Sequence, residues 1–219
     1  MFHFFCAENS IYNPNAKIKL KLKIRKPPLS VRTFKQKNNM SNLCGIDLGN
    51  QNSVVGVPGP NGVDIISNQS SNRMTPTMVT YTNERRYAGE MAHQHQIEHC
   101  KTTITQLKYL IGMAYDSDYR REVESTISFD LAELEDGLTG IKVHYMDKDM
   151  VLRPEQCIAF LLKDLIQLAK ATNPTVEKCV ISVSSWWSDC YRRTLLNAVK
   201  IGDINCLALI NSTTAAAIA

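Results

Sequence analysis

The sequence predicts an α/β fold in which a β-meander is followed by a βαβα segment, so that the sheet is mixed. Three observations support this prediction: turn-bounded apolar runs between residues 43 and 66, an amphipathic helical pattern after Pro154, and alternating strand and helix patterns from residue 179 onward. Turn-separated runs are typical of antiparallel strands, and alternating strands and helices of parallel ones. Ligands of such sheets gather at the carboxyl ends of the strands. The ends expected here are 47–49, 183–184 and 211–212.

The first half of the chain is expected to contain short strands and one helix. The strands are apolar or β-branched runs bounded by turn residues, at 43–48, 53–57, 63–66, 77–81 and 87–89. Residues 97–111 are expected to form a helix, because Ile104, Leu107 and Ile111 follow helical spacing and Gly112 suits the end of a helix.

The second half is expected to contain a hairpin and then alternating helices and strands. Residues 129–145 are strand-like and contain Asp136-Gly137, which is a hairpin signal. Pro154 suits the first turn of a helix, and apolar residues then recur at helical spacing until about residue 172. The elements expected next are a strand at 179–183, a helix at 188–201, a strand at 207–210 and a helix from Ser212.

Length and composition favour an ordinary globular protein of one or two modest domains. The chain has 219 residues, of which 44% are hydrophobic and 21% are charged. No apolar run approaches the roughly 20 residues that cross a bilayer, so no transmembrane segment is predicted. The seven cysteines are scattered singly. This scatter favours reduced thiols in a cytoplasmic protein over disulfides or a cysteine metal site.

Positive charge is concentrated in residues 1–39, which contain nine Lys or Arg and one acid. This arm carries a net charge of +8, and the net charge of +4 for the whole chain leaves −4 for residues 40–219. The basic isoelectric point therefore reflects the arm, and nucleic-acid binding by the protein is not expected.

Two interpretations of the arm remain open. Residues 17–25 alternate cations with aliphatic residues, a pattern that suits a strand with one charged face. As a functional segment, the arm would tether the protein to an anionic surface or target an organelle. The interpretation we favour is a disordered extension ahead of a start at Met40, because charge and Pro27-Pro28 leave little apolar surface to bury. The globular domain then spans residues 40–219.

Asp47 is an acid inside the apolar strand pattern Gly45-Ile-Asp-Leu-Gly49. Burying a carboxylate is costly unless it is paired, hydrogen-bonded or bound to a cation. Asp47 is therefore either part of a binding site or a cap for the hairpin turn that follows it.

Five motifs occur in a recognisable order: GIDLGNQNSVVGV, SNRMTPTMVTY with RRYAGEMA, LKYLIGM, VISVSSWW and LALINSTTAAAIA. In order and spacing they resemble the first lobe of the nucleotide-binding domain of the heat-shock protein 70 family, over residues 43–219. Asn50 and Asn52 stand where the 70 class has threonines, and this resembles the 110 class. The resemblance implies an actin-like ATPase fold of the ribonuclease H-like type, of which only the first lobe is present.

The resemblance also implies a site for ATP or ADP with Mg²⁺. The amides of the hairpin turn would bind the phosphates, since a tight turn aims several N–H dipoles at one point. Asp47 would face Mg²⁺ through water. Ser184 and Arg192 fall at a proline and an arginine that relay the nucleotide state. The implied nucleotide-binding residues are Gly49, Asn50, Gln51 and Asn52.

At the catalytic positions the sequence departs from the family. We assign His93, in GEMAHQH, to the position of the family's lysine, and Ser212 to that of its glutamate. Histidine cannot reproduce a fixed ammonium, and serine cannot hold metal-bound water as a carboxylate does. No residue is therefore assigned as catalytic, and efficient ATP hydrolysis is not expected.

His93, His95 and His99 form a further cluster, for which a metal site is the alternative interpretation. Residues two apart point to different helix faces, and no cysteine or carboxylate is recognised as completing the set at ligand spacing. We therefore expect a solvated histidine cluster.

The function that the resemblance implies is that of a cytoplasmic chaperone of the 70/110 type. Its full-length form would bind ATP, act as a nucleotide exchange factor or co-chaperone for a 70-type chaperone, and hold unfolded polypeptides. The alternatives are an enzyme on the same fold, either a degenerate ATPase or a small-molecule kinase, and an inactive truncated product. Because the sequence stops at Ala219, inside an expected helix, we expect a fragment that binds ATP weakly or not at all.

Overall fold

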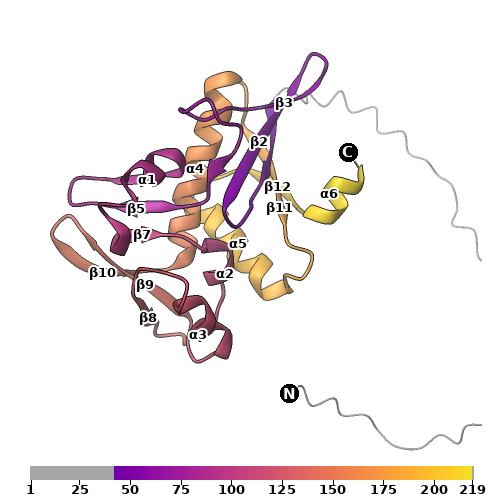
Figure 1. Cartoon of the computed structure of the whole chain (residues 1–219). Helices are drawn as coiled ribbons and strands as arrows, with labels where there is room; N and C mark the ends of the chain where they lie inside the picture. The colour runs from indigo at the N-terminus through magenta and orange to yellow at the C-terminus, as the bar shows by residue number, and fades with distance from the viewer. Residues whose placement is uncertain (1–41, 219) are drawn as a thin grey trace, which may run out of the picture. The chain divides into compact units, whose positions relative to one another are not determined.

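The computed structural model describes residues 42–218 (Figure 1). The predicted arm, residues 1–39, lies outside the described residues, and so does the expected start of the globular domain at Met40. Among the helices between residues 42 and 218, none has the length and apolar content needed to cross a membrane.

A mixed sheet forms the centre of the described part and confirms the predicted fold class. Its strand order is β12-β11-β1-β2-β3, with β4 paired to β2. β1 and β12 both run parallel to β11, whereas β1, β2 and β3 pair antiparallel as a meander. The bounds are β1 Leu43–Asp47, β2 Asn52–Gly59, β3 Gly62–Ile65, β4 Thr75–Pro76, β11 Lys178–Val183 and β12 Cys206–Asn211.

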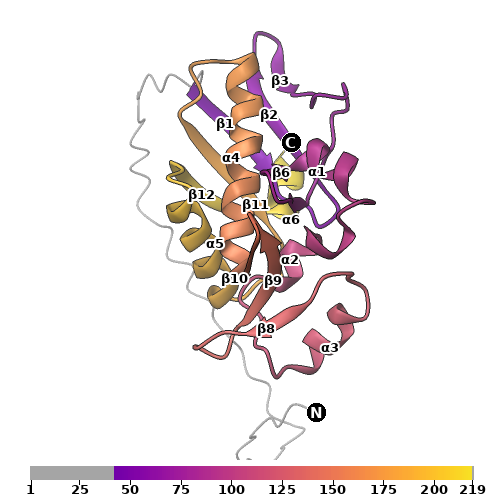
Figure 2. The same cartoon turned by 90° about the vertical axis from the view of Figure 1, so that its left-hand side faces the viewer.

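Two helices, α4 (Pro154–Thr172) and α5 (Asp189–Ile201), pack on one face of this sheet (Figure 2). The start of α4 is fixed by Pro154 in its first turn and by the Arg153 amide, which donates to Gln156 Oε1 at 2.9 Å. The apolar stripe of α4 packs against alternate residues of the strands, and these side chains together form the hydrophobic core. The core residues include Cys44, Ile46 and Leu48 of the β1 segment, Leu161, Leu162 and Leu165 of α4, and Ile181 of β11.

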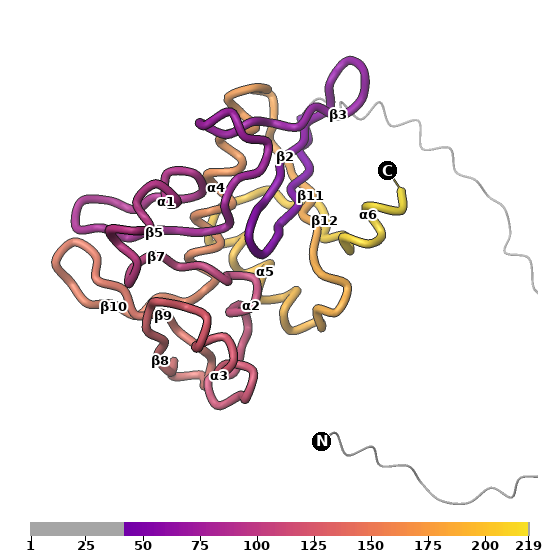
Figure 3. Tube along the Cα trace, viewed as in Figure 1, coloured from indigo at the N-terminus to yellow at the C-terminus, as the bar shows by residue number. Residues whose placement is uncertain are grey.

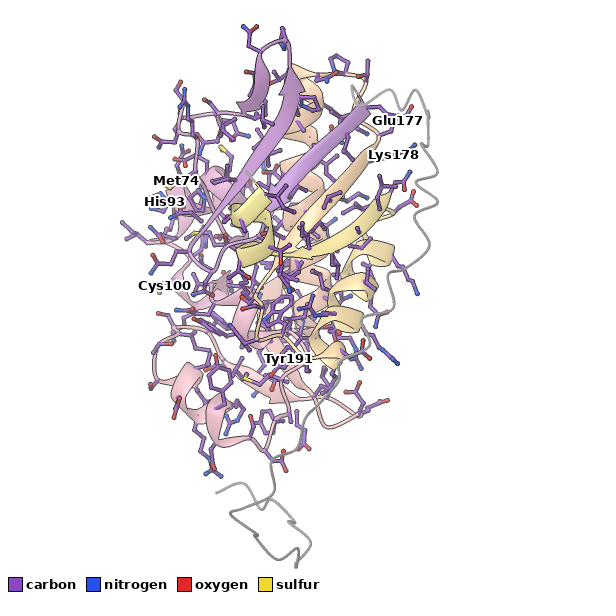
Figure 4. The ribbon with its side chains drawn as sticks, turned by 90° about the vertical axis from the view of Figure 1, so that its right-hand side faces the viewer. Met74, His93, Cys100, Glu177, Lys178 and Tyr191 are labelled. Carbon is purple, nitrogen blue, oxygen red and sulfur yellow. The ribbon has the colours of Figure 1, made fainter. Side chains whose placement is uncertain are left out.

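The opposite face of the sheet carries the residues of β1 that point away from α4. Gly45 and Asp47 are exposed there, because side chains alternate between the two faces of a strand. Helix α6 (Ser212–Ile218) lies on this side, in front of the strands in Figure 4. The Asp47 side chain therefore lies on the face of the sheet that bears α6, and not in the core between the sheet and α4 and α5.

Two small sheets and several short helices complete the described part of the chain. One sheet has the order β6-β5-β7 and the other β10-β9-β8, whose β8–β9 hairpin confirms the Asp136-Gly137 signal. The bounds are β5 Val79–Tyr81, β6 Arg86–Ala88, β7 Thr103–Ile104, β8 Leu131–Glu133, β9 Thr139–Tyr145, β10 Lys148–Leu152, α1 Gly89–His95, the 3-10 helix η2 Cys100–Thr102, α2 Leu107–Leu110 and α3 Asp118–Glu124.

The prediction of a single helix at residues 97–111 is wrong. In Figure 3 the chain passes from α1 through the extended strand β7 before it reaches the short helix α2. Thr103 and Ile104 are β-branched and pair with β5, which outweighs the helical spacing of the apolar residues. Gln106 then takes a left-handed backbone conformation, with φ at 54°, and α2 begins at the next residue.

A buried hydroxyl pair joins β2 to the segment after β4. Ser53 Oγ and Thr77 Oγ1 are 2.8 Å apart, and both residues are almost fully buried.

We expect Ser53→Ala to lower the free energy of unfolding by about 1–2 kcal/mol, because the Thr77 hydroxyl is left without its partner. Urea unfolding of Ser53→Ala, Thr77→Val and the double variant measures the coupling. Purely additive losses would show that this pair contributes nothing of its own.

Candidate functional site

Asp47 lies at the carboxyl end of β1. There the sheet brings together one aspartate and two serine side chains, which are linked by hydrogen bonds. Its Cα partner on β11 is Ser182, whose hydroxyl donates to the Asp47 carboxylate. Ser212 Oγ, at the start of α6, lies 3.1 Å from Ser182 Oγ and 3.1 Å from the Val183 carbonyl oxygen. The expected convergence of the strand ends at Asp47 and Ser212 is thus present, and Ser182 connects them.

The hairpin turn after β1 is held closely against its neighbours. A Cβ on Gly49 would lie 1.9 Å from the Asn52 carbonyl oxygen, so the backbone folds back at a distance that only glycine allows. The Thr77 amide donates to the Gln51 carbonyl at 2.8 Å, and Asn50 Nδ2 donates to Gln106 Oε1 at 2.6 Å. These contacts fix the turn from two sides.

Lys108 supplies a cation at this site. It lies on α2, and its ammonium donates a hydrogen bond to the Leu48 carbonyl at 2.5 Å. Leu48 is the residue that follows Asp47 in the chain. Its Nζ is also 6.0 Å from the centre of the buried Trp187 ring. Burial lowers the pKa of Lys108 from its usual 10.5, and the negative charge of Asp47 opposes this shift.

Lys108 is a cation at this strand end that the sequence analysis did not identify. His93, to which we assigned the family's lysine, is an exposed residue of α1 and is labelled at the side of the molecule in Figure 4. The contact of Lys108 with Leu48 spans 60 positions of the chain, which is why periodicity did not reveal it. The available signal was the LKYLIGM motif itself, which contains Lys108.

The two residues predicted as a relay are in contact. The Arg192 side chain, on α5, donates through Nη2 to the Ser184 carbonyl at 3.4 Å and to Asn211 Oδ1 at 2.8 Å. Its Nε donates to the Trp187 carbonyl at 3.1 Å. Arg192 therefore ties the ends of β11 and β12 together, beside the start of α6.

The donor set at this strand end fits a divalent cation with a phosphate. Asp47 is exposed, and carboxylate oxygens together with water are what Mg²⁺ prefers. The turn after Gly49 is tight, and amides of tight turns suit anions. Lys108 adds a positive charge beside Leu48, at the end of the same strand. Ser212 contributes a hydroxyl and no carboxylate to this set.

Comparison with known proteins gives matches that cover most of this chain. A family model described as "Hsp70 protein" matches residues 43–219. Heat shock 70 kDa protein 4 of Rattus norvegicus is 37% identical over 81% of this chain, and that of Homo sapiens is 36% identical over the same share. Heat shock protein 88 of Dictyostelium discoideum is 36% identical over 82%. The chain covers 21% of the first two relatives and 23% of the third, about a fifth of their length. The chain therefore belongs to the Hsp70 family, and its similarity to heat shock 70 kDa protein 4 agrees with the 110-class resemblance of its hairpin.

Proposed function

We propose that this chain supplies the phosphate-binding hairpin of a chaperone of the 70/110 type. The complete protein would bind ATP or ADP with Mg²⁺, and act as a nucleotide exchange factor or co-chaperone for a 70-type chaperone. It would hold unfolded polypeptides and work in the cytoplasm. The observation that carries the proposal is the convergence of Asp47, the turn 49–52 and Lys108 at one strand end.

Each group has a separate task in this proposal. The turn amides would orient the phosphate oxygens, and Lys108 would offset their negative charge. Asp47 would bind the Mg²⁺ through water, and the hydrogen bond that it accepts from Ser182 fixes the direction of its carboxylate. When bound, Mg²⁺ neutralises phosphate charge and fixes the geometry of the phosphate chain.

Slow hydrolysis is expected from the same set of residues. Positioned charges provide most of the rate in phosphoryl transfer, and Ser212 offers no carboxylate to hold metal-bound water. Lys108 nevertheless places a cation beside Leu48, close to the hairpin turn that would bind the phosphates. A slow ATPase is therefore the second candidate function. The observation that favours it is the contact of the Lys108 ammonium with Leu48, next to the hairpin turn.

Nucleotide binding is tested by following backbone amide NMR signals during titration with Mg·ATP. Because Asp47, Gln51 and Asn52 are exposed to solvent, we expect weak but saturable shifts, confined to residues 47–52 and the surroundings of Lys108. Asp47→Asn is expected to remove the dependence on Mg²⁺ while the ATP-induced shifts of the turn persist. Asp116→Asn, an exposed acid outside the site, is the matched control.

Shifts that are scattered over the surface, or equal in both variants, would contradict the proposed site. The exchange role is a separate question for the complete gene product. There we expect faster release of fluorescent ADP from a 70-type chaperone, measured by stopped flow.

A further inference from the structure

The segment between α1 and β7 brings together two histidines and a glutamate. The ligand atoms of His95, Glu98 and His99 all lie within 4.8 Å of one another. His99 Nε2 and Glu98 Oε2 are 3.9 Å apart, and the rings of His95 and His99 have their centres 6.3 Å apart. These three residues, which we call the HxxEH cluster, are separate in sequence and in role from the Asp47 site.

The backbone of this cluster is fixed by local hydrogen bonds. The His99 amide donates to the His95 carbonyl at 3.1 Å, so one helical turn continues beyond α1 and places both imidazoles on one side. The His99 carbonyl in turn accepts from the Thr102 amide at 3.0 Å and from Thr103 Oγ1 at 2.9 Å. The backbone of His99 is therefore held by η2 and by the strand β7 that follows it.

The ring of His95 is also held by packing. It stacks on Tyr87 of β6, with ring centres 4.2 Å apart and an interplanar angle of 24°. Both imidazoles are partly buried, whereas Glu98 is exposed and free to turn toward them. Little rotational freedom of the His95 ring would thus be lost when a ligand binds.

We propose that His95, Glu98 and His99 bind Zn²⁺, with water in the fourth position. Two imidazole nitrogens and one carboxylate oxygen are a donor set that zinc uses in tetrahedral sites. The spacing His-x-x-Glu-His is known from zinc-binding helices, where the two histidines are the ligands and the glutamate is a general base; here the glutamate oxygen lies close enough to act as a third ligand. The structure overturns the expectation that no carboxylate completes the histidine cluster, because Glu98 does so and His93 is outside the group.

Titration of the reduced full chain with zinc chloride, in competition with a chromophoric chelator, tests this site. We expect one zinc ion per chain. Loss of one ligand, in His95→Asn or His99→Asn, is expected to weaken binding by about tenfold or more. His93→Asn is the matched control, since it removes a histidine of the same helix that is outside the cluster, and its affinity should equal that of the wild type.

Cobalt substitution identifies the ligands directly. Nitrogen and oxygen ligands give visible d–d bands without the near-ultraviolet thiolate band that Cys100, the next residue after His99, would produce. Circular dichroism verifies that each variant is folded. The proposal is overturned by a thiolate band, by zinc binding that survives in the His95→Asn/His99→Asn double variant, or by an absence of saturable binding up to about 100 μM zinc.

Discussion

Gly49→Ala is expected to lower the free energy of unfolding by about 3 kcal/mol and to abolish the Mg·ATP-induced shifts of the hairpin turn. The added Cβ would lie 1.9 Å from the Asn52 carbonyl oxygen, which is a backbone atom of the same turn. The turn cannot open without losing the bond from the Thr77 amide to Gln51 or the bond between Asn50 and Gln106. Urea unfolding and the NMR titration measure the two effects.

Gly45→Ala is the matched control for this prediction. It makes the same chemical change four positions earlier in β1, where a Cβ would meet nothing within 4 Å. We expect its stability to equal or slightly exceed that of the wild type, because alanine loses less backbone entropy than glycine on folding. Equal losses of stability in the two variants would show that strand propensity, and not the closeness of the turn, explains the result.

Local patterns in the sequence were sufficient to predict the central sheet and its two long helices. The meander depends on short turns, and α4 on Pro154 and a long apolar stripe, and each of these signals lies within a few residues of the element it specifies. The resulting strand order brought Asp47 and Ser212 to one end of the sheet, as the βαβα pattern predicts. Membership of the Hsp70 family, shown by the match over residues 43–219, agrees with an actin-like fold for this region.

Features that depend on distant contacts could not be predicted in this way. Residues 97–111 carry apolar residues at helical spacing, yet pairing of β7 with β5 and the hydroxyl contact between Thr80 and Thr103, at 2.8 Å, select a strand. Ser182 is an unremarkable strand residue in the sequence, and only the parallel register with β1 places it against Asp47. Lys108 likewise contacts Leu48 from 60 positions away, and no local sequence pattern predicts a contact over that distance.

Lys108→Met is expected to weaken Mg·ATP binding while it raises the stability of the folded chain. The ammonium is a charge-assisted donor, and such a bond contributes about 1.5–3 kcal/mol, which corresponds to a loss of affinity of about 10- to 100-fold. Methionine keeps the length of the side chain and removes the cost of holding a charge in a half-buried position. Lys163→Met, at an exposed position of α4, is the matched control and should change neither property.

The dependence of stability on pH distinguishes this explanation from a simple packing effect. Because the pKa of Lys108 is lower in the folded chain than its usual 10.5, the unfolded chain binds more protons between these two values. The stability of the wild type therefore rises with pH across this window, and the cost of the buried ammonium is fully present below it. The stability advantage of Lys108→Met should be largest at neutral pH and should shrink as the pH approaches 10.5. An advantage that does not vary with pH would show that it comes from methionine packing. A loss of stability at neutral pH would show that the hydrogen bond of Lys108 to Leu48 and its attraction to Asp47 outweigh the cost of its burial.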